Sequence, residues 1–424
     1  MMRLSKTSGT GGTIKNDPES FVVEEITGNG TVLALGKTFA AGDLGEETDA
    51  GGKFTRFVMQ KRNWNTIGAM KEIVKRFGRG IKSAGYAGMK DKISVSTQLA
   101  SAFGITPEEI LKINAKDITI NGAWRSKEGV KIGGLLGNRF GIIISDAENP
   151  DNAGKVFEEL DLRMPNYFDK QRFGYRLNNF RIGLHIMRGE FEDAVMDFLT
   201  CIDNESNEDA NAARISLRES MDFKKAISEF PRFLNGERTV LDYLAKYPTN
   251  YANAINALPR GLSIMFIHAV EDALFNFTVE SQIKNGGFDD AVLRCGTNFY
   301  GFPDISTTVS CGSGDGRNLP FPVANIVGYE TREEYLSGYE KEALDRIGVT
   351  KEMFRVKRLP HLGMRGSFRP LLSTFVNPLV SREGNGLRVG FSCPSGTYAT
   401  ILMDEIIKAR SIGLNAIAPE LASP

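Results

Sequence analysis

The sequence is poor in the residues that build metal centres and disulfide frameworks. Its 424 residues include only four cysteines and three histidines. Zinc sites and disulfide frameworks use closely spaced cysteines, and no two cysteines here form a CxxC pair. We therefore expect no metal, no disulfide and a reducing, cytoplasmic compartment. The cysteines are Cys201, Cys295, Cys311 and Cys393, and the histidines are His185, His268 and His361.

Long apolar runs are also missing. No stretch approaches the roughly 20 apolar residues that cross a bilayer. The opening residues MMRLSKTSGTGGTIK lack the apolar core of a secretion signal. We expect no membrane association.

The common motifs of cofactor and hydrolytic chemistry are absent as well. Gly36, Lys37 and Thr38 resemble the end of a phosphate-binding loop, but Thr31 stands where that loop requires glycine. The chain has no GxGxxG, HExxH, GxSxG or DxDx[TV] motif. We expect no bound cofactor.

The net charge is zero, but the two signs are separated along the chain. Between residues 56 and 92, ten basic residues stand against two acidic ones, a net charge of +8 (10 − 2). Between residues 190 and 229, four basic residues stand against eleven acidic ones, a net charge of −7 (4 − 11). The basic block can form a nucleic-acid footprint on a neutral protein. It can also be a solvated face without a partner.

The length of the chain makes two domains the default expectation. Strand-like and helical segments alternate without the regular βαβ rhythm of a parallel sheet, which favours an α+β fold with a mixed, mostly antiparallel sheet. The pattern predicts strands near 21–26, 31–35, 93–100, 141–145 and 387–392, and helices from Thr66 and over 181–199, 263–280 and 399–410.

Asp91 lies in the most informative run, GYAGMKDKISVSTQLA (85–100), just before a β-branched, strand-like stretch. An aspartate in a turn before a strand is common and needs no chemical role. The neighbouring residues favour a different interpretation. The run resembles the catalytic motif of the TruD family of pseudouridine synthases, GxKD followed by TxQ, which here comprises Gly88, Lys90, Asp91, Thr97 and Gln98.

Further segments similar to those of this family follow in order along nearly the whole chain. Several colinear motifs are far more specific than any one of them. They are KNDPESFVVE from Lys15, NWNT from Asn63, GNRF from Gly137, PNYFDKQRFG from Pro165, FN from Phe275 and PSGTYAT from Pro394.

Three positions depart from the family pattern. Asp169 replaces a glycine, Cys393 replaces a leucine, and Asp404 stands where arginine is common. The last change removes any ion pair that such an arginine would make. None of the three removes Asp91.

The resemblance implies a cofactor-free enzyme that isomerises uridine to pseudouridine in RNA with Asp91 as the nucleophile. Whether the carboxylate attacks the sugar or assists a glycal-like intermediate stays open. The implied substrate is transfer RNA at a uridine of the D-arm (position 13), with other RNA as an open alternative. The implied catalytic domain spans 1–170 and 370–424 and is interrupted by a second α+β domain at 171–369. We expect a monomer.

Two kinds of side chain should accompany Asp91. Lys15, which matches a lysine of the opening motif, is the candidate for holding the carboxylate, with an ordinary strand-edge cation as the alternative. We expect Lys90 and Lys92 to face solvent or RNA phosphates.

A base extruded from an RNA helix stacks on aromatic rings. Phe140 is the first candidate for that ring, with a plain core position as the alternative. Asn138 would contact the base or the backbone. We expect Asn166 and Arg172 to support the wall of the active site by hydrogen bonds.

Two other functions stay open at this point. A non-catalytic RNA-binding or chaperone protein could keep the same fold, and a hydrolase could use Asp91 as a base. The intact Asp91 argues against the first, and the lack of a second carboxylate or metal motif argues against the second.

Overall fold

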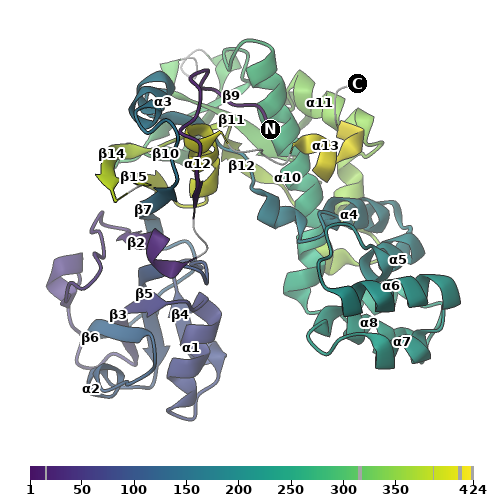
Figure 1. The fold of residues 1–424 in the computed structure, drawn as a ribbon, viewed down its shortest axis with the longest axis horizontal. Helices are drawn as coiled ribbons and strands as arrows, with labels where there is room; N and C mark the ends of the chain where they lie inside the picture. Colours follow the sequence, from purple (N-terminus) through teal and green to yellow (C-terminus); the bar gives the residue numbers. More distant parts are fainter. Residues whose placement is uncertain (15–16, 314–317, 385, 409–412, 422–424) are drawn as a thin grey trace.

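The computed structural model describes residues 1–14, 17–313, 318–384, 386–408 and 413–421, which form an arch with two arms (Figure 1). Strands and short helices from the first part of the chain make one arm, and a group of helices makes the other. The last strands and α12 (Ala399–Ile407) lie in the part that joins the arms (Figure 1). The fold is α+β, as the sequence predicts.

A nine-stranded sheet runs through the first arm and the joining part. Its order is β14-β15-β7-β2-β5-β3-β6, with β1 beside β7 and β4 beside β5. β2 and β5 pair in parallel, and the other described pairs are antiparallel, so the sheet is mostly antiparallel as predicted. The strands are β1 (Thr13–Ile14), β2 (Phe21–Thr27), β3 (Phe54–Arg62), β4 (Ala84–Tyr86), β5 (Val95–Phe103), β6 (Ile118–Ser126), β7 (Leu135–Ser145), β14 (Val376–Glu383) and β15 (Gly386–Pro394).

The central strand β7 joins the two ends of the chain. It pairs with β2 on one side and β15 on the other, so Phe140 lies opposite both Val23 and Phe391. These three side chains are buried in one core, covered by α3 (Asn152–Leu160) and α12. On the other half of the sheet, α1 (Thr66–Lys75) buries Met70 and Ile73 in a second core. The helix α2 (Pro107–Leu111) lies beside β6 and β3.

The chain between these parts forms the helical arm and a smaller sheet. The helices are α4 (Asn179–Arg188), α5 (Phe191–Thr200), α6 (Glu208–Ser220), α7 (Phe223–Glu229), α8 (Asn235–Leu244), α9 (Tyr251–Asn256), α10 (Arg260–Lys284) and α11 (Gly338–Arg346). The smaller sheet has the order β10-β9-β11-β12, made of β10 (Pro303–Ser310), β9 (Leu293–Thr297), β11 (Phe321–Ile326) and β12 (Ser367–Pro370). A two-stranded sheet of β13 (Leu372–Thr374) and β8 (Arg163–Pro165) and the short α13 (Leu414–Ile417) complete the described elements. The large sheet takes no strand from the range 171–369. The predicted domain limits themselves stay a prediction.

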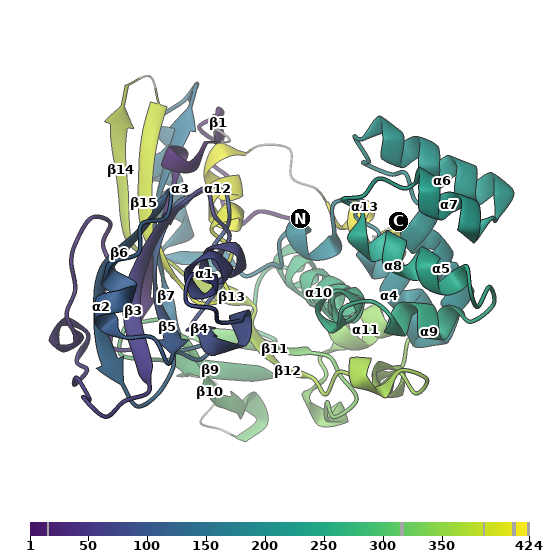
Figure 2. The same cartoon turned by 90° about the horizontal axis from the view of Figure 1, so that it is seen from below.

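The long helix α10 belongs to two cores at once and lies between the large sheet and the helical arm (Figure 2). Phe266 and Val270 are buried in the core of the helical arm, whereas Phe275 and Val279 are buried with α12 and β15. By length and composition α10 could span a membrane, but 78% of its most apolar window is buried inside the protein. That burial is typical of a core helix.

Two predicted elements differ from the structure. The helix predicted over 181–199 is two helices, because Gly189 takes a left-handed conformation (φ +82°) between α4 and α5. Residues 31–35 form one isolated bridge and no strand. There the backbone N–H of Leu35 donates to the side chain of Glu24 (2.8 Å), so a side chain replaces a ladder partner.

Asn276 of α10 should contribute strongly to the stability of this junction. Its fully buried amide accepts from the N–H of Phe168 (2.8 Å) and donates to the C=O of Phe168 (2.9 Å). Asn276→Ala leaves both backbone groups without these bonds, which costs about 1–3 kcal/mol each. We expect a drop of several degrees in Tm, measured by calorimetry. Asn253→Ala, at an exposed helix position, should change Tm little, and equal effects would contradict this role.

Candidate active site

Asp91 lies in the loop between β4 and β5 and lines a pocket of about 360 Å³. Segments that are far apart in the sequence meet in this pocket. β2 contributes Phe21 and Val23, the Asp91 loop contributes Gly88 to Asp91, and β7 contributes Asn138 and Phe140. The remaining wall comes from Leu135, Asp169 and Gln171 and from the segment 395–400.

Buried polar contacts fix the backbone of the Asp91 loop. The N–H of Lys90 donates to the hydroxyl of Thr66 (2.9 Å), and the amide of Gln98 donates to the C=O of Gly88 (3.1 Å). The ammonium of Lys90 pairs with Glu25 at 2.6 Å, and both side chains are almost fully buried. The expectation that Lys90 faces solvent or RNA is therefore wrong, because its charge is used inside the protein. Lys92 is exposed, as expected.

Lys61 of β3 supports the same loop from below the surface. Its side chain is fully buried, and its ammonium donates to the C=O of Asp91 (2.9 Å) and the C=O of Trp64 (2.5 Å). Burial lowers the pKa of Lys61 to about 8, against the opposing pull of the Asp91 charge. A positive charge therefore lies behind the Asp91 loop at neutral pH.

The carboxyl group of Asp91 has a raised pKa. The main cause is the loss of hydration among surrounding protein atoms, and the negative charge of Asp169 adds to it. Lys61 and Lys90 act in the opposite direction. Asp91 is nevertheless exposed to solvent, because it lines a pocket that opens to the protein surface. Protein atoms still surround most of its carboxyl group.

Asn138 and Phe140 project from β7 into the pocket with Asp91. The side-chain oxygen of Asn138 is buried and has no hydrogen-bond partner among the described residues, which leaves it free to accept from a bound molecule. Phe140 is 8% exposed, and its ring centroid lies 6.1 Å from that of Phe21 and 5.4 Å from that of Phe391. It is thus a core residue that also lines the pocket, and its stacking role stays a prediction.

Comparison with known proteins agrees with this geometry. The family model described as tRNA pseudouridine synthase D (TruD) matches residues 1–406. The chain belongs to the TruD family. A relative from Methanosarcina acetivorans, named as a tRNA pseudouridine synthase D, is 30% identical over 95% of this chain and 94% of its own. A relative of the same name from Thermococcus sibiricus is 31% identical over 96% of this chain and 97% of its own.

A solved structure shares the fold. It is a crystal structure of a protein from Methanosarcina mazei assigned as tRNA pseudouridine synthase D, with a TM-score of 0.75 and 27% identity, covering 97% of this chain and 96% of that one. The TruD fold is therefore shown for this protein.

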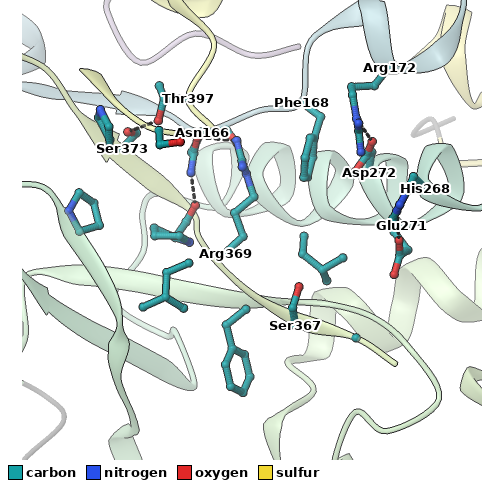
Figure 3. A pocket seen from close by; sticks show the side chains of 18 of the residues that line it. Asn166, Phe168, Arg172, His268, Glu271, Asp272, Ser367, Arg369, Ser373 and Thr397 are labelled. Atoms are coloured by element: carbon teal, nitrogen blue, oxygen red, sulfur yellow. Dashed lines mark hydrogen bonds and ion pairs between the residues drawn. The ribbon is translucent and has the colours of Figure 1, made fainter. Parts of the chain in front are cut away.

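The TruD motif residues Asn166 and Arg172 lie in an adjoining pocket of about 430 Å³ (Figure 3). The amide of Asn166 donates to the C=O of Pro370 (2.8 Å) and accepts from Arg369 (2.7 Å). Arg172 pairs with Asp272 of α10 at 2.7 Å. Ser395 and Thr397 line both pockets and so form a wall that the two pockets share. Asn166 and Arg172 lie on the side of this wall that faces away from Asp91. Their part in substrate binding stays a prediction.

Lys15, the predicted partner of Asp91, lies outside the described residues. Sequence reasoning missed Lys61 and Glu25 as supports of the Asp91 loop. A signal for Lys61 was present, because Phe57, Met59 and Lys61 alternate along a strand and all face inward. A lysine in phase with buried apolar residues needs an internal partner.

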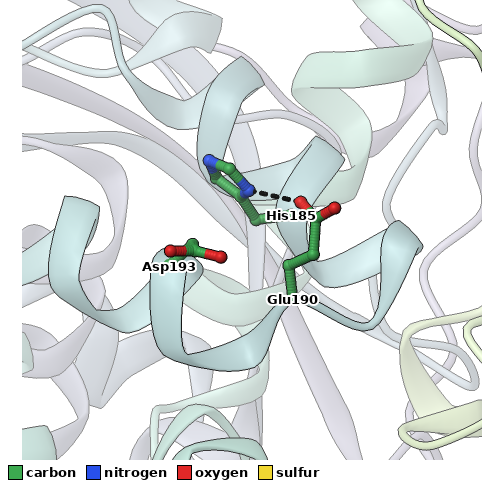
Figure 4. Close-up of side chains that lie close together, drawn as sticks. All are labelled: His185, Glu190 and Asp193. Carbon is green, nitrogen blue, oxygen red and sulfur yellow. Dashed lines mark hydrogen bonds and ion pairs between the residues drawn. The ribbon is translucent and has the colours of Figure 1, made fainter.

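One cluster of side chains on the helical arm could hold a metal ion: His185, Glu190 and Asp193 (Figure 4). His185 already hydrogen-bonds Glu190 at 2.7 Å, and both acids are exposed. Exposed groups of this kind are common without a metal. The expectation that the protein uses no metal stays a prediction.

The role of Lys61 can be tested by pH dependence. Lys61→Met removes a charge that lowers the pKa of Asp91, so that pKa should rise and the acidic limb of the kcat/KM profile should move to higher pH. Loss of the two hydrogen bonds should also reduce kcat/KM by about 10- to 100-fold. In the unmodified protein, activity should decline as the pH passes about 8, where Lys61 loses its proton.

Lys246→Met, at an exposed position of the helical arm, is the matched control and should leave the profile unchanged. An unshifted acidic limb in a folded Lys61→Met protein would rule out the electrostatic role.

Proposed function

We propose that this protein is a tRNA pseudouridine synthase, an isomerase that uses Asp91 as the nucleophile on a uridine of the D-arm, at position 13. The observation that carries the proposal is the placement of Asp91 in a pocket beside an unpaired polar atom of Asn138, above a buried lysine. The family supplies the reaction class and the substrate class.

The reaction rearranges one nucleoside without a donor. The N1–C1′ bond of the uridine breaks, the base turns, and a C5–C1′ bond forms. C5 gives up its hydrogen as a proton, and N1 carries a proton in the product, so the atoms balance without an oxidant or a cofactor. Asp91 either bonds to C1′ or removes a proton from the sugar to give a glycal-like intermediate.

The pocket supplies what this rearrangement needs from the protein. A volume of about 360 Å³ is in the range of small-molecule sites. The target base must leave its helix, which costs a few kcal/mol, and stacking on Phe140 would return about 1–3 kcal/mol. Asn138 would hold the base while the glycosidic bond is open. Lys61 and the Lys90–Glu25 pair keep the loop from moving away from the sugar.

The basic surface of α1 and the turn after it suits the RNA backbone. The cations of α1 and the turn after it are exposed, namely Lys71, Lys75, Arg76, Arg79 and Lys82. Of these, Arg76 forms an ion pair with Glu72 at 2.8 Å. The helical arm carries the acidic block, which would repel RNA. Phosphates should therefore lie on the α1 side of the arch.

The chemistry is tested by release of tritium from RNA labelled at C5 of uridine. Asp91→Asn keeps the shape of the side chain but cannot act as a nucleophile, so we expect release to fall by at least about 10³-fold while RNA binding stays within a few-fold. Asp242→Asn, an exposed aspartate of α8, is the matched control. RNA binding by the unmodified protein without any release would favour the non-catalytic RNA-binding alternative.

The RNA surface is tested by salt dependence. Lys75→Gln with Arg79→Gln removes two exposed charges of the basic block. The slope of log affinity against log salt should become shallower by about two units, one for each lost phosphate contact. Lys224→Gln with Lys246→Gln on the helical arm removes the same charge and should leave the slope unchanged. Equal changes in both proteins would contradict a localised surface.

A further inference from the structure

The pocket that adjoins the Asp91 pocket contains a cation without a counter-charge. Its wall includes two matched pairs, Arg172 with Asp272 at 2.7 Å and His268 with Glu271 at 2.7 Å (Figure 3). Arg369 lies in the same wall and forms no ion pair with any described residue. Of the two arginines in this inner wall, Arg172 has a carboxylate partner and Arg369 has none among the described residues.

The hydrogen bonds of Arg369 hold it in place without neutralising it. Nε donates to the C=O of Asn166 (3.1 Å), and Nη2 donates to the side chain of Asn166 (2.7 Å) and to the C=O of Gly396 (3.0 Å). Its other terminal nitrogen, Nη1, has no hydrogen bond to the described part of the chain. The guanidinium also lies 4.1 Å from the ring centroid of Phe168, which fixes its plane.

A guanidinium held in this way is suited to an anion. Burial lowers the pKa of Arg369 to about 10, so the group keeps its charge at neutral pH. A cation taken out of water without a partner is costly, and an incoming phosphate offsets that cost with charge-assisted hydrogen bonds. Phosphate is also the anion that arginine recognises best by its planar fork.

The opposite side of the pocket is apolar. It is formed by Pro303 and Ile305 of β10, Ile326 of β11 and Phe368 of β12. Ile305 is 43% exposed, which leaves apolar surface open to a bound molecule. A ligand with an anionic group on one side and a flat or apolar group on the other matches this lining, and a nucleotide has both.

The two pockets share a wall, the loop from Pro394 to Thr397. Ser395 and Thr397 line both pockets, and Arg369 holds the C=O of Gly396 at the middle of that loop. An RNA strand that leaves the Asp91 pocket across this loop would enter the second pocket next to Arg369.

We propose that the second pocket binds the nucleotide next to the target uridine, with Arg369 holding the phosphodiester between the two. This subsite rests on the proposed function, because it needs a uridine in the Asp91 pocket. It would make recognition extend from the target base to its neighbour in the chain, and it would position the target sugar by its own phosphate.

The test is a double-mutant cycle in which the charge is removed from the RNA linkage, from Arg369, or from both. Transfer RNA is assembled with one uncharged methylphosphonate linkage at successive positions around the target uridine, and its binding is measured with the full chain carrying Asp91→Asn, so that the RNA stays unmodified. One linkage directly 5′ or 3′ of the target should weaken binding by about 10- to 100-fold. In the same chain with Arg369→Gln, that linkage should change binding less than about twofold, and Arg369→Lys should keep part of the sensitivity.

Arg365→Gln is the matched control, since Arg365 lies at the exposed edge of the same pocket and pairs loosely with Glu330 at 3.8 Å. It should leave the linkage sensitivity intact. Equal loss of sensitivity in this control overturns the subsite, because the effect would then come from diffuse charge.

Three other outcomes overturn the subsite, and one of them also overturns the proposed function. If no uncharged linkage next to the target weakens binding, a phosphate contact at Arg369 is excluded. This outcome does not depend on Arg369→Gln, so it holds even if that substitution disturbs the fold. A sensitive linkage elsewhere in the RNA excludes the neighbouring nucleotide. Failure of unmodified transfer RNA to bind overturns both proposals, whereas binding without a coupled linkage overturns the subsite alone.

Discussion

The Asp91 pocket depends on the buried ammonium of Lys61 beneath the loop that carries Asp91. The loop offers its carbonyl oxygens inward, and a buried carbonyl needs a donor. Lys61 supplies that donor to Asp91 and Trp64 together, from a strand whose same face buries Phe57 and Met59. One charge therefore satisfies the backbone and lowers the cost of keeping the Asp91 carboxylate ionised where protein has displaced much of its water.

This arrangement needs both ends of the chain to form one sheet. β7 presents Asn138 and Phe140 toward Asp91 only because β2 and β15 flank it, and the segment after β15 closes the pocket. The helical arm adds a second pocket through α10, whose Asp272 pairs with Arg172 and whose Glu271 hydrogen-bonds His268. The site is thus assembled from the sheet, the joining part and the face of α10 that carries Asp272.

The sequence predicted the parts of this molecule that depend on local pattern. The mostly antiparallel α+β fold, the α1 helix and the strand after Asp91 follow from periodicity and composition. The motif order led to Asp91, Asn138 and Phe140, which the structure brings into one pocket. The inward direction of Lys90 could not be predicted, because it depends on Glu25 of a strand that is distant in the sequence. Nor could sequence spacing show that Asn166 and Arg172 lie across a loop from Asp91, since that separation arises from tertiary packing.

Because the segment 395–400 comes late in the sequence, the pocket can be completed only late in the synthesis of the chain. Asp91 and its supporting lysine belong to the first quarter of the chain, whereas the wall at residues 395–400 belongs to its last tenth. At a synthesis rate of about 5–20 residues per second, roughly 15–60 s separate the synthesis of Asp91 from that of the residues that complete its pocket. During that interval the nascent chain contains Asp91 without the segment that closes its pocket. A chain released before residue 395 would contain the Asp91 motif but lack one wall of the pocket.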